Sequence, residues 1–147
     1  NAVVLNNMGV AARWMNDYKN ADSYYQSSRN AGGTVDNNLG TLNTVKGDYK
    51  KAVGYFGSTC SFNAALAKVL DGKYDDGTKT LDCSKSSTTA ASYYLKEIIS
   101  ARTDKKDMVV SNLKNAIKAD ASYKAKAADD LEFAKLRDNE EFKSLVQ

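Results

Sequence analysis

Residues 37–56 read NNLGTLNTVKGDYKKAVGYF, and this stretch decides the fold. Leu39, Leu42 and Val45 recur three residues apart, which places them along one side of a helix. Gly47 follows this run and can adopt the positive φ of a helix end. The first half of the stretch therefore predicts a helix that ends in a tight turn.

The second half of the stretch predicts a partner helix. Asp48 follows the turn and is a suitable N-cap. Apolar residues then recur at helical spacing, namely Tyr49, Ala52, Val53 and Phe56. Two helices joined this tightly must run nearly antiparallel, and the small residues Gly40 and Ala52 allow their axes to approach closely.

This hairpin pattern recurs along the chain at constant offsets. A copy lies 31 residues upstream, where Asn6-Asn7-Met8-Gly9, Asp17-Tyr18, Ala21 and Tyr25 match Asn37-Asn38-Leu39-Gly40, Asp48-Tyr49, Ala52 and Phe56. A third copy lies 25 residues downstream, where Asn63, Gly72, Tyr74 and Leu81 match Asn38, Gly47, Tyr49 and Phe56. A fourth copy closes with Leu113 and Asn115-Ala116-Ile117, and Leu113 lies 32 residues after Leu81. Four shared positions at one offset are hard to obtain by chance.

The pattern resembles the tetratricopeptide repeat, a unit of about 34 residues with a Leu-Gly pair, a Tyr, and then an Ala and an aromatic residue four positions apart. The resemblance covers roughly residues 2–121 and implies an all-α, right-handed solenoid of about four αα-hairpins. The expected hairpins are approximately residues 2–32, 33–58, 59–86 and 88–121. The later copies depart from the pattern, because Ala64-Ala65 and Lys96-Glu97 replace the Leu-Gly pair and Gly77 and Val109 replace the Ala.

Details of the first three hairpins follow from the same pattern. In the first helix, residues 2–14, we expect Leu5, Met8 and Ala12 to face inward. Trp14 either packs at the edge of that helix or serves as an exposed aromatic anchor. Further breaks and caps are expected at Gly32-Gly33, at Thr34 or Asp36, and near Gly57, where a shortened helix should end.

The tail of the chain differs from the hairpins. Its segment EFAKL at residues 132–136 is nearly repeated nine residues later as EFKSL at residues 141–145. A solenoid needs its last apolar face covered by an element with a polar outer side. We therefore expect residues 122–147 to form a C-terminal helical cap, with the carboxylates of Asp129, Asp130 and Glu132 on its exposed side.

The two cysteines lie at the two ends of the third hairpin. Cys60 precedes its first helix and Cys83 ends its second, and those ends are neighbours in an antiparallel pair. A disulfide is plausible if the two Cα atoms come within about 7 Å. It would indicate a periplasmic or extracellular setting, whereas two free, half-buried thiols would suit a cytosolic protein.

Catalytic chemistry finds little support in the sequence. Histidine is absent, which removes the commonest general base and metal ligand. Two cysteines alone cannot build a structural zinc site, and no glycine-rich phosphate loop follows a strand. We therefore expect no enzymatic activity, no catalytic residue, no metal site and no cofactor.

In tetratricopeptide arrays the first helix of each hairpin lines a concave groove that commonly holds an extended peptide. Carried over to this chain, the resemblance assigns the groove to Asn6, Val10, Arg13, Asn37, Thr41, Thr44, Phe62, Tyr94 and Arg102, with Leu66, Val69 and Ile98 beside them. Asparagine can pair with both polar groups of a peptide backbone, and arginine with carboxylates. Each of these residues is alternatively ordinary surface or packing between hairpins.

The implied function is a scaffold that binds a protein or peptide partner, as part of a larger bacterial cell-envelope protein. The chain does not begin with Met, so we expect a fragment or a mature form. A homo-oligomer that pairs a patch of Phe62, Leu66 and Val69 is one alternative. An RNA or polyanion binder is another, against which the near balance of 21 basic and 18 acidic residues speaks. No run of about 20 apolar residues exists, so no membrane span is expected.

Overall fold

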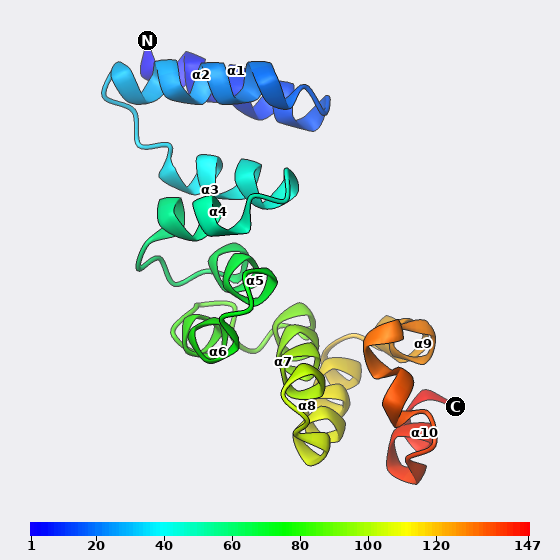
Figure 1. Cartoon of the computed structure of the whole chain (residues 1–147). Coiled ribbons are helices and arrows are strands. Elements are labelled where there is room, and N and C mark those ends of the chain that lie inside the picture. The colour runs from blue at the N-terminus through cyan, green and yellow to red at the C-terminus, as the bar shows by residue number, and fades with distance from the viewer. The chain divides into compact units, whose positions relative to one another are not determined.

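The computed structural model describes all 147 residues, and the fold is all-α (Figure 1). Ten α-helices and one short 3-10 helix follow one another without any strand. The chain forms two compact units, of which unit 1 comprises Asn1–Thr59 and Asn63–Lys73 and unit 2 comprises Cys60–Phe62 and Tyr74–Gln147. None of the helices is long and apolar enough to cross a membrane.

Unit 1 contains two helical hairpins and most of a further helix. The helices are α1 (Ala2–Trp14), α2 (Tyr18–Asn30), α3 (Asp36–Val45), α4 (Tyr49–Phe56) and α5 (Phe62–Leu70). The second helix of each hairpin begins at the predicted cap, because Asp17 accepts a hydrogen bond from the Asn20 amide at 3.2 Å and Asp48 accepts one from the Lys51 amide at 3.3 Å. The hairpins predicted from the spacing are confirmed here.

In both hairpins of unit 1, a glycine of the first helix lies against an aromatic ring of the second helix. A Cβ atom on Gly9 would lie 2.5 Å from ring atoms of Tyr25, and one on Gly40 would lie 2.8 Å from the ring of Phe56. Both rings are buried. The expected close approach of the two helix axes is therefore real, and an aromatic ring lies directly over each glycine.

Unit 2 contains the rest of the helices. These are α6 (Tyr74–Asp82), α7 (Ala90–Arg102), α8 (Lys106–Ala119), α9 (Ser122–Asp129), the 3-10 helix η1 (Leu131–Leu136) and α10 (Glu140–Val146). Helices α7 and α8 lie side by side, and the last three elements pack on them (Figure 1). The core consists of Tyr94, Val109, Leu113, Ala116, Ala127, Phe133, Leu136 and Phe142.

The same turn follows each of the helices α1, α3, α5 and α7. Each turn contains one residue with positive φ, which is Asn16 at 59°, Gly47 at 81°, Gly72 at 77° or Asp104 at 56°. The residue after it donates its amide to a carbonyl five positions earlier, in the pairs Asp17 to Ala12, Asp48 to Asn43, Lys73 to Lys68 and Lys105 to Ser100, all at 2.8 to 2.9 Å. This is the Schellman geometry of a helix end. The four turns recur at offsets of 31, 25 and 32, the same offsets as in the sequence.

Some predicted details of unit 1 are wrong. Helix α3 begins at an N-cap of Val35 without a side-chain hydrogen bond, so neither Thr34 nor Asp36 caps it. Val45 is 52% exposed. A step of three residues turns the helix by about 300°, so after two steps Val45 lies about 120° away from Leu39 around the helix.

In α1, Met8 differs from the expectation, and Trp14 follows the exposed one of its two expected placements. Met8 is 40% exposed, whereas its neighbour Gly9 is buried. Trp14, at the end of α1, is 77% exposed and does not pack as an edge residue.

Candidate functional site

The first helices of the first two hairpins are linked by their asparagines. The Nδ2 amide of Asn38 in α3 donates a hydrogen bond of 2.7 Å to Oδ1 of Asn6 in α1. This bond leaves the NH2 group of Asn6 as a donor for another group. Asn37, the residue before Asn38 on α3, is exposed. Two of the candidate asparagines therefore lie close together in unit 1.

The candidate threonines of α3 have their donors occupied. The hydroxyl of Thr41 donates to the Asn37 carbonyl and that of Thr44 to the Gly40 carbonyl, both at 2.9 Å. A threonine hydroxyl bonded in this way retains lone pairs and can only accept further hydrogen bonds. A partner at this face would therefore have to offer donors to Thr41 and Thr44, such as its backbone N–H groups.

Arg13 and Val10 complete the candidate residues of α1. Val10 is half-buried and packs against the core of unit 1. The Arg13 guanidinium carbon lies 5.8 Å from the ring centroid of Trp14, and its Nε atom is buried without a hydrogen-bond partner. Because Nε is buried, only the other guanidinium nitrogens of Arg13 could donate hydrogen bonds to a partner's carboxylate.

The candidate residues of α5 are less open than expected. Phe62 and Leu66 are half-buried, and Val69 is only 2% exposed. The apolar patch that these three residues were expected to form is therefore not an open surface, because Val69 belongs to the interior.

Tyr94 was expected on an open groove, but it is buried at 4% exposure. Its hydroxyl donates to Oδ2 of Asp130 at 2.6 Å, and the rings of Tyr123 and Phe133 lie at centroid distances of 5.1 and 5.7 Å. Burial and the bond to Asp130 raise the pKa of Tyr94 far above its usual value. The side chain holds α7 to the C-terminal elements and is not accessible to a partner.

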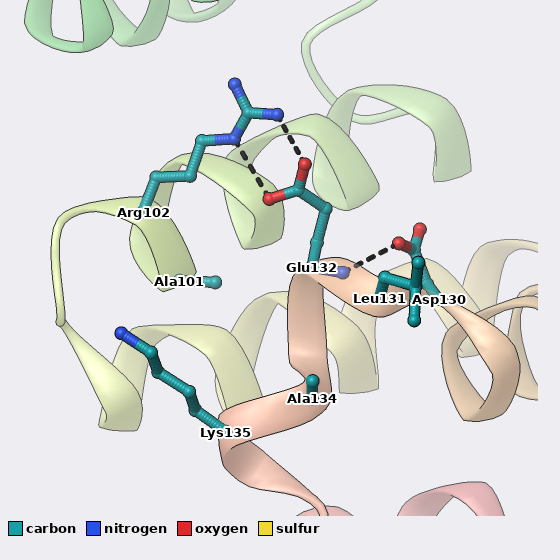
Figure 2. Close-up of a pocket in the computed structure, with 7 residues that line it drawn as sticks. All are labelled: Ala101, Arg102, Asp130, Leu131, Glu132, Ala134 and Lys135. Carbon is teal, nitrogen blue, oxygen red and sulfur yellow. Dashed lines mark hydrogen bonds and ion pairs between the residues drawn. The ribbon is translucent and has the colours of Figure 1, made fainter.

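Arg102 is likewise paired within unit 2 (Figure 2). Its guanidinium forms a two-fold interaction with the carboxylate of Glu132, in which Nε lies 2.9 Å from Oε2 and Nη2 contacts Oε1. Two of the three carboxylates that were expected on the exposed side of the cap, Asp130 and Glu132, thus bind residues of α7, whereas Asp129 is exposed. The expectation of solvated carboxylates is wrong at these two positions.

An open hollow lies beside this ion pair. It has a volume of about 440 Å³ and is lined by Ala101, Arg102, Asp130, Leu131, Glu132, Ala134 and Lys135 (Figure 2). Leu131 is 80% exposed at its rim. The charges of Arg102 and Glu132 largely compensate each other, so the guanidinium is not free to bind a ligand. The groups that the hollow still offers are the apolar side chain of Leu131 and the cation of Lys135.

A second hollow of about 440 Å³ lies among α6, α7 and α8. Lys79, Lys96 and Lys105 line it together with Asp75 and Asp82. Lys96 is bound to Asp82 at 2.6 Å. The mixture of charges makes this hollow a poor site for a polyanion.

Glu97 is the residue that reasoning from the sequence missed. It is fully buried, and neither of its carboxyl oxygens has a hydrogen-bond partner. Burial, with a smaller effect from the charge of Asp130, raises the pKa of Glu97 to about 8. A signal existed, because Glu97 occupies the position of Gly9, Gly40 and Ala65 in the other three copies at offsets of 31, 25 and 32.

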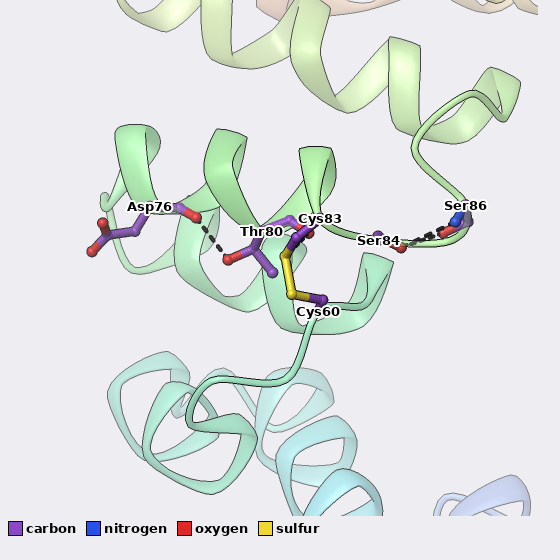
Figure 3. The surroundings of a disulfide bond; sticks show 6 residues. All are labelled: Cys60, Asp76, Thr80, Cys83, Ser84 and Ser86. Atoms are coloured by element: carbon purple, nitrogen blue, oxygen red, sulfur yellow. Dashed lines mark hydrogen bonds between the residues drawn. A yellow bond between two sulfur atoms is a disulfide. The ribbon is translucent and has the colours of Figure 1, made fainter.

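Cys60 and Cys83 form a disulfide bond, with their Cα atoms 5.5 Å apart (Figure 3). Both cysteines are exposed. The bond ties the segment before α5 to the end of α6, next to the serine-rich turn of Ser84 and Ser86.

No cluster of three or more potential metal-ligating side chains occurs in the chain. Comparison with known protein families and with curated proteins found no match to this sequence.

Proposed function

We propose that this chain is a helical-repeat scaffold of the tetratricopeptide type, and that it binds a protein or peptide partner through the face of α1 and α3 in unit 1. The observation that carries the proposal is the hydrogen bond from Asn38 to Asn6, since it sets two successive first helices side by side with exposed Asn37 next to them. The side chains of Asn6, Asn37, Thr41 and Arg13 are of types that donate hydrogen bonds to, or accept them from, a peptide backbone. Stacking of the hairpins into a right-handed solenoid is part of the same proposal.

The setting we propose is the periplasm or the cell envelope of a bacterium. The disulfide between Cys60 and Cys83 supports it, because such bonds persist in oxidising compartments and are rare in the cytosol. Tyr94 and Arg102 are left out of the proposed binding face, since both are engaged within unit 2.

The proposal is tested with peptides selected from a display library on the intact chain. For a selected peptide, backbone amide shifts are measured by NMR on titration, together with the dissociation constant for an Asn37→Ala variant. A loss of binding by about 10-fold, typical of losing hydrogen bonds worth roughly 1.4 kcal/mol, is expected with shifts confined to α1 and α3.

The matched control is Ser27→Ala, which alters an exposed residue of α2. It should bind as tightly as the wild type. Shifts that cluster on α2 and α4, or equal loss of binding in both variants, would move the partner site away from the first helices.

A further inference from the structure

Helix α1 has an apolar face that no element of unit 1 covers. Val4, Met8 and Met15 are 55%, 40% and 79% exposed, and Ala11 is exposed between them. Steps of four, three and four residues place these side chains in one stripe along the helix. An open hollow of about 270 Å³ adjoins the stripe, and Met8, Ala11 and Met15 line it.

The repeat identifies the residues that occupy the same place in the second hairpin. Val35, Leu39 and Leu42 lie 31 positions after Val4, Met8 and Ala11. These residues are 2%, 0% and 0% exposed, and they share one apolar cluster with Ala21 and Tyr25 of α2. The face that is open on α1 is therefore covered on α3 by the second helix of the preceding hairpin.

The third hairpin repeats this arrangement within unit 1. Ala64 and Ala67 of α5 are fully buried in a cluster with Ala52 and Phe56 of α4. In both cases the covering helix is the second of a hairpin and presents an alanine with an aromatic residue four positions later. The chain thus contains two examples, α2 and α4, of the helix type that covers the apolar face of a first helix.

The interface between the first two hairpins also has a polar part, an asparagine–asparagine hydrogen bond, and its equivalent on α1 is unoccupied. In the second hairpin, Asn38 donates its amide to Asn6 of the first helix before it. Its equivalent 31 residues earlier is Asn7, which is exposed. The apolar stripe and Asn7 together reproduce both parts of the interface that joins the first two hairpins.

We propose that the α1 face, formed by Val4, Asn7, Met8 and Ala11, docks a further hairpin of this same kind; Met15, whose equivalent Lys46 is exposed, lies outside it. The second helix of that hairpin would carry an alanine and an aromatic residue four positions apart, and its first helix would offer an asparagine to Asn7. None of these four residues is charged, so burying the face itself desolvates no charge. The one charged residue that lines the adjoining hollow is Asp17. The proposal does not depend on what the face of α1 and α3 binds.

A second copy of this chain is a weaker occupant. Its matching helices, α2 and α4, already cover α3 and α5 of their own unit. The open α1 of a second copy lacks the alanine and aromatic pattern seen in both covering helices. Continuity with the existing interface of α2 and α3 therefore favours an additional hairpin.

The test adds a copy of residues 1–31 directly before Asn1 of the intact chain, which preserves the 31-residue spacing. Thermal unfolding is followed by circular dichroism. Stability in stacked repeats grows through nearest-neighbour interfaces, so the midpoint is expected to rise by about 5 °C or more. Met8→Asp in the original copy should abolish the rise, because it places a charge in the new apolar interface.

The matched control is Ser23→Asp, which adds the same charge at an exposed position of α2 and should leave the rise intact. In the unextended chain Met8→Asp should change the midpoint by only about 1 °C, since the residue is exposed there. No rise on extension, or a rise that survives Met8→Asp, would overturn the proposal. So would a mass of the unextended chain that doubles with concentration in sedimentation and returns to that of a monomer with Met8→Asp.

Discussion

At the scale of single residues, one position of the repeat holds a different residue type in the third and fourth copies than in the first two. Gly9 and Gly40 make room for an aromatic ring, and Ala65 replaces them in the third copy. The fourth copy places Glu97 there, in an interior where its carboxyl group finds no partner. An isolated charge in such surroundings costs so much that the group remains protonated instead.

The stability of unit 2 should therefore depend on pH through Glu97. Its pKa in the folded chain, about 8, lies above the ordinary value of 4.5, so the folded state binds the proton more tightly than the unfolded state. The contribution is fully present below about pH 4.5 and decreases by about 1.4 kcal/mol per pH unit up to about pH 8. Glu97→Gln, which stays neutral, should remove this slope and raise the free energy of unfolding at pH 8.

Urea unfolding at pH 5, 6.5 and 8 measures the effect. The control is Glu141→Gln, an exposed residue whose substitution should leave the slope as in the wild type. If Glu97→Gln shows the same pH dependence as the wild type, Glu97 is charged in the folded chain and the assignment is wrong.

At the scale of helices, the hairpins depend on glycines that lie under rings. Gly40→Ala would bring a methyl group within 2.8 Å of the Phe56 ring, so we expect the free energy of unfolding to fall by about 1–2 kcal/mol. Gly54→Ala is the matched control, because a Cβ atom there meets nothing within 4 Å. It should stabilise α4 by about 0.5–1 kcal/mol through helix propensity. Chemical denaturation of both variants distinguishes packing from propensity, and a gain at both positions would contradict the packing argument.

The junction between α7 and η1 is a second feature at this scale. Arg102 and Glu132 are each about one-third exposed in their side chains, so solvent screens much of their attraction. A double-mutant cycle with Arg102→Gln and Glu132→Gln should yield a coupling of about 1 kcal/mol, at the upper end for a two-fold pair near the surface. A coupling near zero would mean that Tyr94, Phe133 and Phe142 hold the C-terminal elements without help from the ion pair.

At the scale of the whole molecule, the disulfide closes a long loop. Cys60 and Cys83 are 23 residues apart, for which the chain-entropy model gives about 3 kcal/mol of stabilisation. Reduction with dithiothreitol should lower the unfolding midpoint of the wild type. Dithiothreitol should not change the midpoint of a Cys60→Ser/Cys83→Ser variant. That variant lacks the disulfide, so its midpoint should equal that of the reduced wild type in either buffer. A reductant-insensitive wild type would show that the closed loop does not contribute to the folded chain's stability.

Much of the local structure could be predicted from the sequence, because helix ends depend on residues near in the chain. The caps Asp17 and Asp48 and the end of α4 at Gly57 follow from such local chemistry. The turn residues Asn16 and Asp104 were readable in principle, since both residue types tolerate positive φ and both lie at the repeat offsets. The exposure of Val45 was readable too, since helix geometry turns it about 120° away from Leu39. The exposure of Met8 and Trp14 was not, because it depends on which elements pack against α1.

By itself, the sequence determined the helical class of the fold, the hairpin boundaries and the internal repeat, since periodicity and capping act over a few residues. Only the tertiary structure decided which side chains face solvent, because exposure depends on elements that are distant in the sequence. It moved Tyr94 from an open groove to a buried bond with Asp130, and it enclosed Glu97. It also left the apolar stripe of α1 uncovered, which periodicity alone could not distinguish from the covered stripe of α3.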